Sequence, residues 1–289
     1  MNLFIFGIGF SGFEIAKSAI AAGMAVAGTT RSSEKAARLN EAGIESFLFD
    51  GGALDSALAA RLSSVTHLVI SVAPGAAGDP VLKALGGGLT PMMPALEWIG
   101  YLSTVGVYGD HGGAWVDEET VCRPVSARSV ERLNAEASWR AAADAADKPL
   151  AILRLSGIYG PGRNSFVNLE DRSAKRIIKP GQYFNRIHVA DIAGAAMMLA
   201  WQRAEGLFNV TDDEPAPPQD VVAYAAQLMG IAPPPETPYA EAEMSAMARS
   251  FYGEVKRVSN AKLRAAGYQF IHPNYRVALD SMWHNGRWR

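Results

Sequence analysis

Three glycines near the start of the chain have the spacing of a phosphate-binding loop. Gly7, Gly9 and Gly12 form a G-x-G-x-x-G pattern directly after a short apolar run, and helical spacing follows as far as Gly23. In a strand–loop–helix context the first glycine makes the tight turn, the second lets the backbone approach a pyrophosphate, and the third lets helix and strand pack closely. The pattern predicts a dinucleotide-binding loop, in which we include Phe10.

The end of the second expected strand indicates which dinucleotide is bound. A chain that prefers NAD usually carries an acidic residue there, about twenty positions after the glycines. This sequence instead has Thr30, Arg31 and Ser32. Because a guanidinium pairs with a 2′-phosphate and a carboxylate would repel it, these residues favour NADP over NAD.

Two further strand ends are expected to line the same cofactor. Asp50 and Gly51 follow the third strand and would lie beside the adenine, whereas Ser71 and Ala73 follow the fourth and would line the ribose and nicotinamide. Both pairs stand at carboxyl ends of strands, where open α/β sheets bind their ligands.

Strand and helix patterns alternate along the first half of the chain. The expected strands lie in residues 2–7, 24–30, 44–50, 67–74, 97–109 and 149–162. This alternation predicts an α/β fold with a Rossmann-type doubly wound parallel sheet over residues 1–160. The Pro- and Gly-rich residues 161–289 predict a smaller C-terminal substrate lobe, with segments 186–202 and 207–211 as candidates to return to the sheet.

The composition argues against several other classes of protein. The 289 residues are 49% hydrophobic, which is typical of a globular chain, and the formal net charge of −2 argues against a dedicated nucleic-acid binder. One cysteine, Cys122, allows neither an intrachain disulfide nor a cysteine-based metal cluster. Neither an apolar run of roughly 18 residues, as a membrane span requires, nor a signal-peptide pattern is found. We expect a cytoplasmic monomer or homodimer.

The ordered set of motifs resembles the extended short-chain dehydrogenase/reductase superfamily, and more narrowly the NAD(P)-dependent epimerase/dehydratase group that acts on nucleotide sugars. The motifs that carry this resemblance are GIGFSG, STVGVYG (103–109), LRLSGIYGPGR (153–163) and RIHVADIA (186–193). The resemblance covers most of the chain and is strongest before about residue 215. It implies a sheet of about seven strands, with the cofactor in the N-terminal part and the substrate under the C-terminal lobe.

The resemblance also implies a catalytic Ser or Thr, and a Tyr followed four residues later by a Lys that lowers the pKa of the Tyr. Thr104 takes the first position, but Arg128 and Arg132 stand where the Tyr and Lys are expected. Arg132 can hold the cofactor ribose, whereas Arg128 keeps its proton and can only polarise a substrate oxygen or clamp a phosphate. Tyr108 is a further candidate for the acid/base group, with shaping of the site as its alternative role.

A basic segment precedes the expected return to the sheet. Six cationic side chains there outnumber two acidic ones, Glu170 and Asp171, which indicates either a cleft for an anionic ligand such as a nucleotide sugar or a basic outer helix face. The six are Arg163, Arg172, Lys175, Arg176, Lys179 and Arg186. His188 and Asp191 are expected to be structural. Two functions stay open: an NADP-binding epimerase/dehydratase-like oxidoreductase, and a non-catalytic NADP(H)-binding redox sensor or scaffold protein.

Overall fold

The computed structural model describes residues 1–86 and 88–289, which divide into two compact units. The first unit consists of Met1–Thr104, Ala127–Arg154 and Ile192–Phe208, and the second of Val105–Ser126, Leu155–Asp191 and Asn209–Arg289. The sequence suggested one boundary near residue 160. In the structure the chain passes between the units several times instead.

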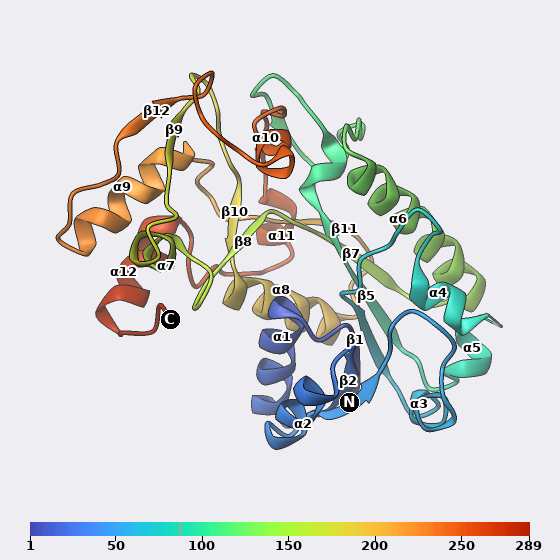
Figure 1. The fold of residues 1–289 in the computed structure, drawn as a ribbon. Coiled ribbons are helices and arrows are strands. Elements are labelled where there is room, and N and C mark those ends of the chain that lie inside the picture. Colours follow the sequence, from blue (N-terminus) through green and yellow to red (C-terminus); the bar gives the residue numbers. More distant parts are fainter. Residues whose placement is uncertain (87) are drawn as a thin grey trace. The chain divides into compact units, whose positions relative to one another are not determined.

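A seven-stranded sheet in the order β11-β7-β5-β4-β1-β2-β3 forms the base of the first unit (Figure 1). The pairs β1–β2, β1–β4, β2–β3 and β4–β5 are parallel. The strands are β1 (Asn2–Phe6), β2 (Ala25–Thr30), β3 (Glu45–Leu48), β4 (His67–Ile70), β5 (Trp98–Thr104), β7 (Leu150–Leu155) and β11 (Gly206–Val210). The order confirms the predicted doubly wound fold. It also confirms that the segment around residues 207–211 returns to the sheet.

Helices cover both faces of this sheet. Figure 1 shows α3, α4, α5 and α6 on one side and α1, α2 and α8 on the other. Their bounds are α1 (Phe10–Ala21), α2 (Ser33–Glu41), α3 (Ser56–Leu62), α4 (Pro80–Leu85), α5 (Leu89–Met92), α6 (Ala127–Ala146) and α8 (Val189–Gln202). Because strands buried on both faces need apolar side chains in both directions, the inner strands β1 and β4 consist mainly of apolar residues.

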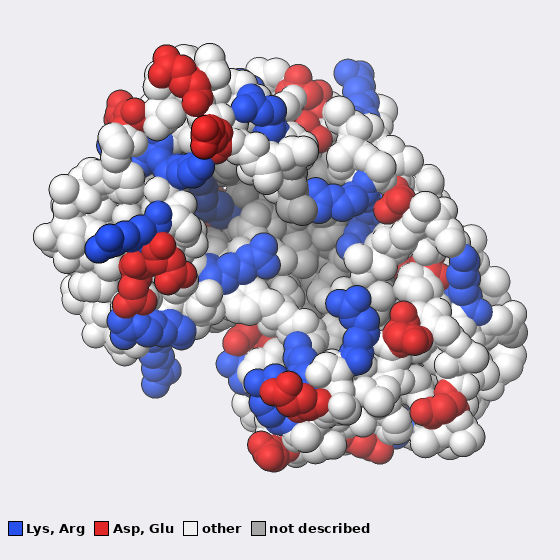
Figure 2. Space-filling model, in the orientation of Figure 1, with Lys and Arg blue, Asp and Glu red and all other residues white. Residues whose placement is uncertain are grey.

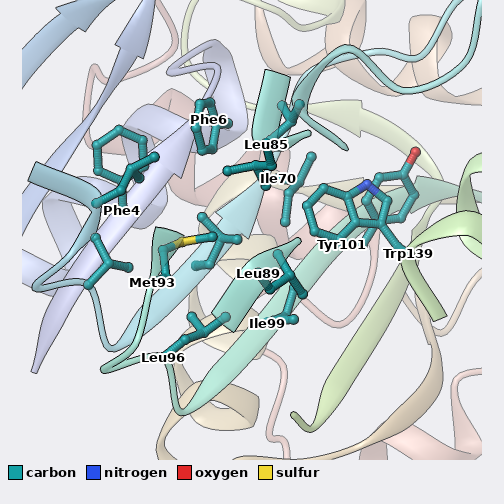
Figure 3. Close-up of a cluster of buried hydrophobic side chains, with 14 of the residues drawn as sticks. Phe4, Phe6, Ile70, Leu85, Leu89, Met93, Leu96, Ile99, Tyr101 and Trp139 are labelled. Atoms are coloured by element: carbon teal, nitrogen blue, oxygen red, sulfur yellow. The ribbon is translucent and has the colours of Figure 1, made fainter. Parts of the chain in front are cut away.

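Aliphatic and aromatic side chains fill the core between the sheet and the α3–α6 layer (Figure 3). Phe4 and Phe6 of β1 are fully buried, and their rings lie 4.9 Å apart. Tyr101 of β5 and Trp139 of α6 are also fully buried, with ring centroids 6.1 Å apart. This contact packs the middle of α6 against β5, so the start of α6 lies near the carboxyl end of that strand.

The second unit is built from short elements around its own cores. Three two-stranded parallel sheets pair β8 (Gly157–Tyr159) with β10 (Arg186–His188), β9 (Arg176–Ile178) with β12 (Glu236–Pro238), and β6 (Trp115–Val116) with β13 (Arg257–Val258). Its helices are the 3₁₀ turn η1 (Val105–Tyr108), α7 (Ser165–Glu170), α9 (Pro218–Leu228), α10 (Ala246–Phe251), α11 (Ala261–Ala265) and α12 (Tyr275–His284). Within the described residues, no helix has the length and apolarity that crossing a membrane requires.

The close approach of β1 and β2 generates a prediction at Gly28. A Cβ added there would lie 2.5 Å from the Ile5 carbonyl oxygen and 2.6 Å from Ile8 Cδ1. Gly28→Ala should therefore lower the free energy of unfolding by about 1–3 kcal/mol, the usual cost of overpacking a core, in a urea titration. Gly75→Ala is the control, because its Cβ meets nothing within 4 Å. Equal stability of the two variants would contradict the packing described here.

Candidate functional site

The glycine loop is fastened to the end of β2. Gly7 has a φ of +87° and donates its N–H to Thr29 Oγ1 at 2.9 Å. The N–H of Ile8 donates to the Thr29 carbonyl at 2.7 Å. A Cβ at Gly12 would lie 3.0 Å from the Gly7 carbonyl oxygen. The tight turn and the close helix packing that the sequence predicted at these two glycines are therefore both present.

The start of α1 carries no side-chain cap that would compete with an anion. The helix begins after Gly9, which has no side chain to cap it, and the first turn carries no acidic residue. A Cβ added at Gly9 would meet nothing within 4 Å, so the space beside the loop is open. Free N–H groups at a helix N-terminus together with the helix dipole favour a negative ligand. This arrangement fits a dinucleotide pyrophosphate.

The residues after β2 differ in what their side chains can offer. Ser32 caps α2, because its hydroxyl accepts the N–H of Lys35 at 3.3 Å, and Thr30 Oγ1 accepts the N–H of Ser32 at 3.4 Å. Arg31 is exposed, and no acidic side chain in the described ranges forms an ion pair with it. Its guanidinium is the cationic group at this strand end.

The neighbouring strand ends lie at the same edge of the sheet. The N–H of Phe49 donates to the Thr30 carbonyl at 3.0 Å, which draws the exposed Asp50 and the following Gly51, with its φ of +105°, toward the end of β2. After β4, the N–H of Ser71 donates to the Phe6 carbonyl at 2.9 Å, and Ala73 is exposed. The strand order changes direction between β1 and β4, which is where open α/β sheets form their ligand crevice.

Arg132 lies across the ends of β4 and β5. Its Nη1 donates to the Leu102 carbonyl at 3.0 Å, to Tyr101 Oη at 3.1 Å and to the Val72 carbonyl at 3.5 Å. Arg128, one turn earlier on α6, is exposed. The two arginines that the sequence singled out therefore have different environments, and only Arg132 is fixed by the sheet through these bonds.

Tyr101 was missed by the sequence reasoning, although it places a phenol beside a cation. Burial raises the pKa of Tyr101 to about 12, and the adjacent Arg132 only partly offsets that effect. The hydroxyl therefore stays protonated at neutral pH, so it can orient the guanidinium but is a poor base. The available signal was a phenol in the strand that ends at the candidate residue Thr104.

A buried ion pair one turn further along α6 was also missed. Glu136 and Arg154 are 1% and 3% exposed, and Arg154 binds both carboxylate oxygens, at 2.7 Å from Nη2 and 3.1 Å from Nε. Ser103 Oγ donates to Glu136 Oε1 at 2.5 Å. Two signals existed: Glu136 continues the four-residue spacing of the arginines, and Arg154 interrupts an apolar strand.

The remaining catalytic candidates lie in different units. Thr104 ends β5 in the first unit and is half-buried. Tyr108 belongs to the second unit, is fully buried, and donates its hydroxyl to Asn209 Oδ1 at 2.7 Å. This bond engages the Tyr108 hydroxyl within the second unit. The catalytic roles of Thr104, Tyr108, Arg128 and Arg132 stay predictions.

A buried cluster in the second unit has the composition of a metal site, but its carboxylate is already engaged by other donors. His188, Asp191 and His272 offer ligand atoms within 4.8 Å of one another. The Asp191 carboxylate, however, accepts from the Tyr268 hydroxyl, from two backbone N–H groups and from His272 Nδ1. His188 Nδ1 accepts the N–H of Ala190 at 3.2 Å, which places the ring proton on Nε2. The cluster therefore supports a structural role for these residues.

Most of the basic segment is engaged with the protein itself. Lys175 and Lys179 donate to backbone carbonyls, Arg176 pairs with Glu236, and Arg186 donates to two backbone carbonyls. Figure 2 shows both cationic and acidic side chains on the face that it draws. These contacts do not test the prediction that the substrate is anionic.

Comparisons with known proteins agree with this geometry. A sequence model described as the NAD dependent epimerase/dehydratase family matches residues 3–210. Protein YeeZ of Escherichia coli K12 is 30% identical over 248 residues, which cover 80% of this chain and 84% of YeeZ. A conserved protein of Silicibacter pomeroyi, described as functionally unknown, is 42% identical with a TM-score of 0.88 and 99% coverage of both chains. The human epimerase family protein SDR39U1, solved with NADPH, shares the fold at 19% identity with a TM-score of 0.75, covering 99% of this chain and 100% of its own.

The stacked histidines of the second unit generate a prediction about acid stability. Burial, with His272 at a ring-centroid distance of 3.9 Å, lowers the pKa of His188 to about 4. The unfolded chain takes up this proton near pH 6.5 and the folded chain only near pH 4, so the stability from neutral His188 is lost as pH falls through that window. The loss amounts to about 3 kcal/mol.

Urea unfolding of the wild type and of His188→Gln between pH 7.5 and pH 4.5 measures this effect as a difference curve. The curve of the variant is subtracted from that of the wild type because other groups also change stability with pH. Burial raises the pKa of Asp212, for example, so this carboxyl adds stability as pH falls over part of the range. His284→Gln on the surface serves as control. Parallel curves for the wild type and His188→Gln would show that His188 is not the titrating group.

Proposed function

Because the chain belongs to the NAD-dependent epimerase/dehydratase family, we propose that it is an oxidoreductase of this type that binds NADP(H) and acts on an anionic small molecule such as a nucleotide sugar. The observation that carries the proposal is the glycine loop fastened to Thr29, beside an α1 N-terminus that no side chain caps. Loop and helix together form a cradle for two phosphates.

Each group at the sheet edge has a separate task in this proposal. The glycine loop and α1 hold the pyrophosphate, Arg31 holds the 2′-phosphate, and Arg132 donates to the nicotinamide ribose. The bound cofactor supplies a carbon that accepts or donates hydride. Thr104 donates a hydrogen bond to the substrate oxygen, and Arg128 polarises that oxygen without exchanging its own proton. The proton itself requires another group, for which the Tyr108 phenol is the remaining candidate from the sequence.

Two finer parts of the proposal rest on charge. Arg31 at the end of β2 favours NADP, and the human relative solved with NADPH is in keeping with that preference. The excess of cations between Arg163 and Arg186 supports an anionic substrate.

The cytoplasm, where cysteines stay reduced, is the proposed compartment of a chain with one cysteine.

A second candidate function is a redox sensor or scaffold that binds NADP(H) without turnover. Three observations favour it: Arg128 stands at the expected acid/base position, Tyr101 has a pKa of about 12, and the Tyr108 hydroxyl is bound to Asn209. If neither Tyr101 nor Tyr108 exchanges a proton near neutral pH, the chain would keep its cofactor site and lose its chemistry.

Arg31 is tested by cofactor affinity. Arg31→Ala should weaken NADPH binding about tenfold or more and leave NADH binding unchanged, because it removes a charge-assisted contact to the 2′-phosphate alone. Fluorescence titration with both cofactors measures the effect. Arg38→Ala, also exposed and on α2, is the control. Equal affinity of the wild type for NADPH and NADH would remove the role given to Arg31.

Turnover distinguishes the two functions. Incubation of the protein and NADP(H) with a panel of nucleotide sugars, followed at the nicotinamide absorbance band, should show hydride transfer for an enzyme. Tyr108→Phe should then lower the rate about a hundredfold or more if Tyr108 supplies the proton, whereas Arg128→Ala should mainly raise KM. Cofactor binding with no turnover on the panel, combined with NADPH-dependent capture of a partner protein, would favour the sensor.

A further inference from the structure

Helix α6 is joined to the sheet by two consecutive polar attachments. At the first, Arg132 donates to Tyr101 and Leu102 of β5. At the second, four residues later, Glu136 accepts from Ser103 of β5 and from Arg154 of β7. Residues four apart lie on one helical face, so both attachments point at the same part of the sheet.

Ser103 connects these attachments to the proposed site. It stands between Leu102, whose carbonyl binds Arg132, and Thr104, the candidate for binding the substrate oxygen. The hydrogen bond from Ser103 to Glu136 therefore fixes the position of the end of β5 along the axis of α6. A small slide of α6 would move Arg132 along the ends of β4 and β5.

Stability alone gives a weak reason for a buried ion pair at this place. Desolvation of two charges offsets much of their attraction, and well-packed apolar pairs often replace such ion pairs without loss. Glu136 nevertheless has both oxygens occupied, by a bidentate guanidinium and by a hydroxyl from another strand. Such a set of directional bonds specifies one register of helix against sheet, which apolar packing specifies less well.

We propose that Glu136 is a positioning residue, held by Ser103 and Arg154, that sets the height of Arg132 over β5 and so places its guanidinium against the cofactor ribose. This inference rests on the proposed role of Arg132. It assigns to Glu136 no contact with cofactor or substrate, and its effect passes through Arg132.

A double-mutant cycle on NADPH affinity tests the inference. Ser103→Ala removes the bond from β5 and keeps the Glu136–Arg154 pair, so this variant should fold. In the presence of Arg132 it should raise the Kd for NADPH about fivefold, and in an Arg132→Gln background it should add nothing, because the two changes act through one contact. Ser138→Ala, on the exposed side of α6, is the matched control and should leave the Kd unchanged.

The arms of the cycle separate the two hypotheses. An unchanged Kd in Arg132→Gln overturns the proposed role of Arg132 and the present inference with it. The inference alone is overturned if Arg132→Gln raises the Kd for NADPH and Ser103→Ala either has no effect on the Kd or adds its full effect in the Arg132→Gln background. The double variant Glu136→Met/Arg154→Leu gives a second test. If its thermal midpoint recovers while its Kd for NADPH stays raised, the positioning role of Glu136 is supported. If the thermal midpoint and the Kd both recover, the Glu136–Arg154 pair is purely structural and the inference is overturned.

Discussion

Thr29 accepts two hydrogen bonds from the glycine loop, one at its hydroxyl and one at its carbonyl, and the geometry of the first unit depends on them. They hold the turn between β1 and α1 against the end of β2, so the N–H groups of α1 face the place where the strand order reverses. Gly28, one residue earlier, lets β2 approach β1 closely enough for these bonds to form. An anion bound there meets a preformed set of donors, because no side chain caps the helix.

The opposite side of the same edge depends on α6. Packing of Trp139 against Tyr101 holds the helix to the sheet, but packing does not by itself choose a height along β5. The directional bonds of Arg132 and Glu136 supply that choice. The Arg132 guanidinium can bind several acceptors in a fixed plane, and its charge only partly offsets the burial that raises the pKa of the Tyr101 phenol.

Buried polar groups behave differently in the second unit. Asp191 is saturated by four donors, and His188 is held neutral by burial beside His272. These groups tie the segment around Tyr268 to the start of α8. Their arrangement supports stability near neutral pH, which is the role that the sequence suggested for His188 and Asp191.

The sequence by itself determined the features that depend on local pattern. Apolar runs and glycine spacing predicted the strands, the doubly wound sheet and the glycine loop, because each is set by residues a few positions apart. It also located Arg31 and Arg132, which stand at fixed offsets within motifs. Tertiary structure alone decided which partners meet: Tyr101 with Arg132, Ser103 and Arg154 with Glu136, and Tyr108 with Asn209. It also decided that each unit is built from three separate segments of the chain. These contacts join residues 18 to 101 positions apart, where strand order and burial, rather than periodicity, set the distance between side chains.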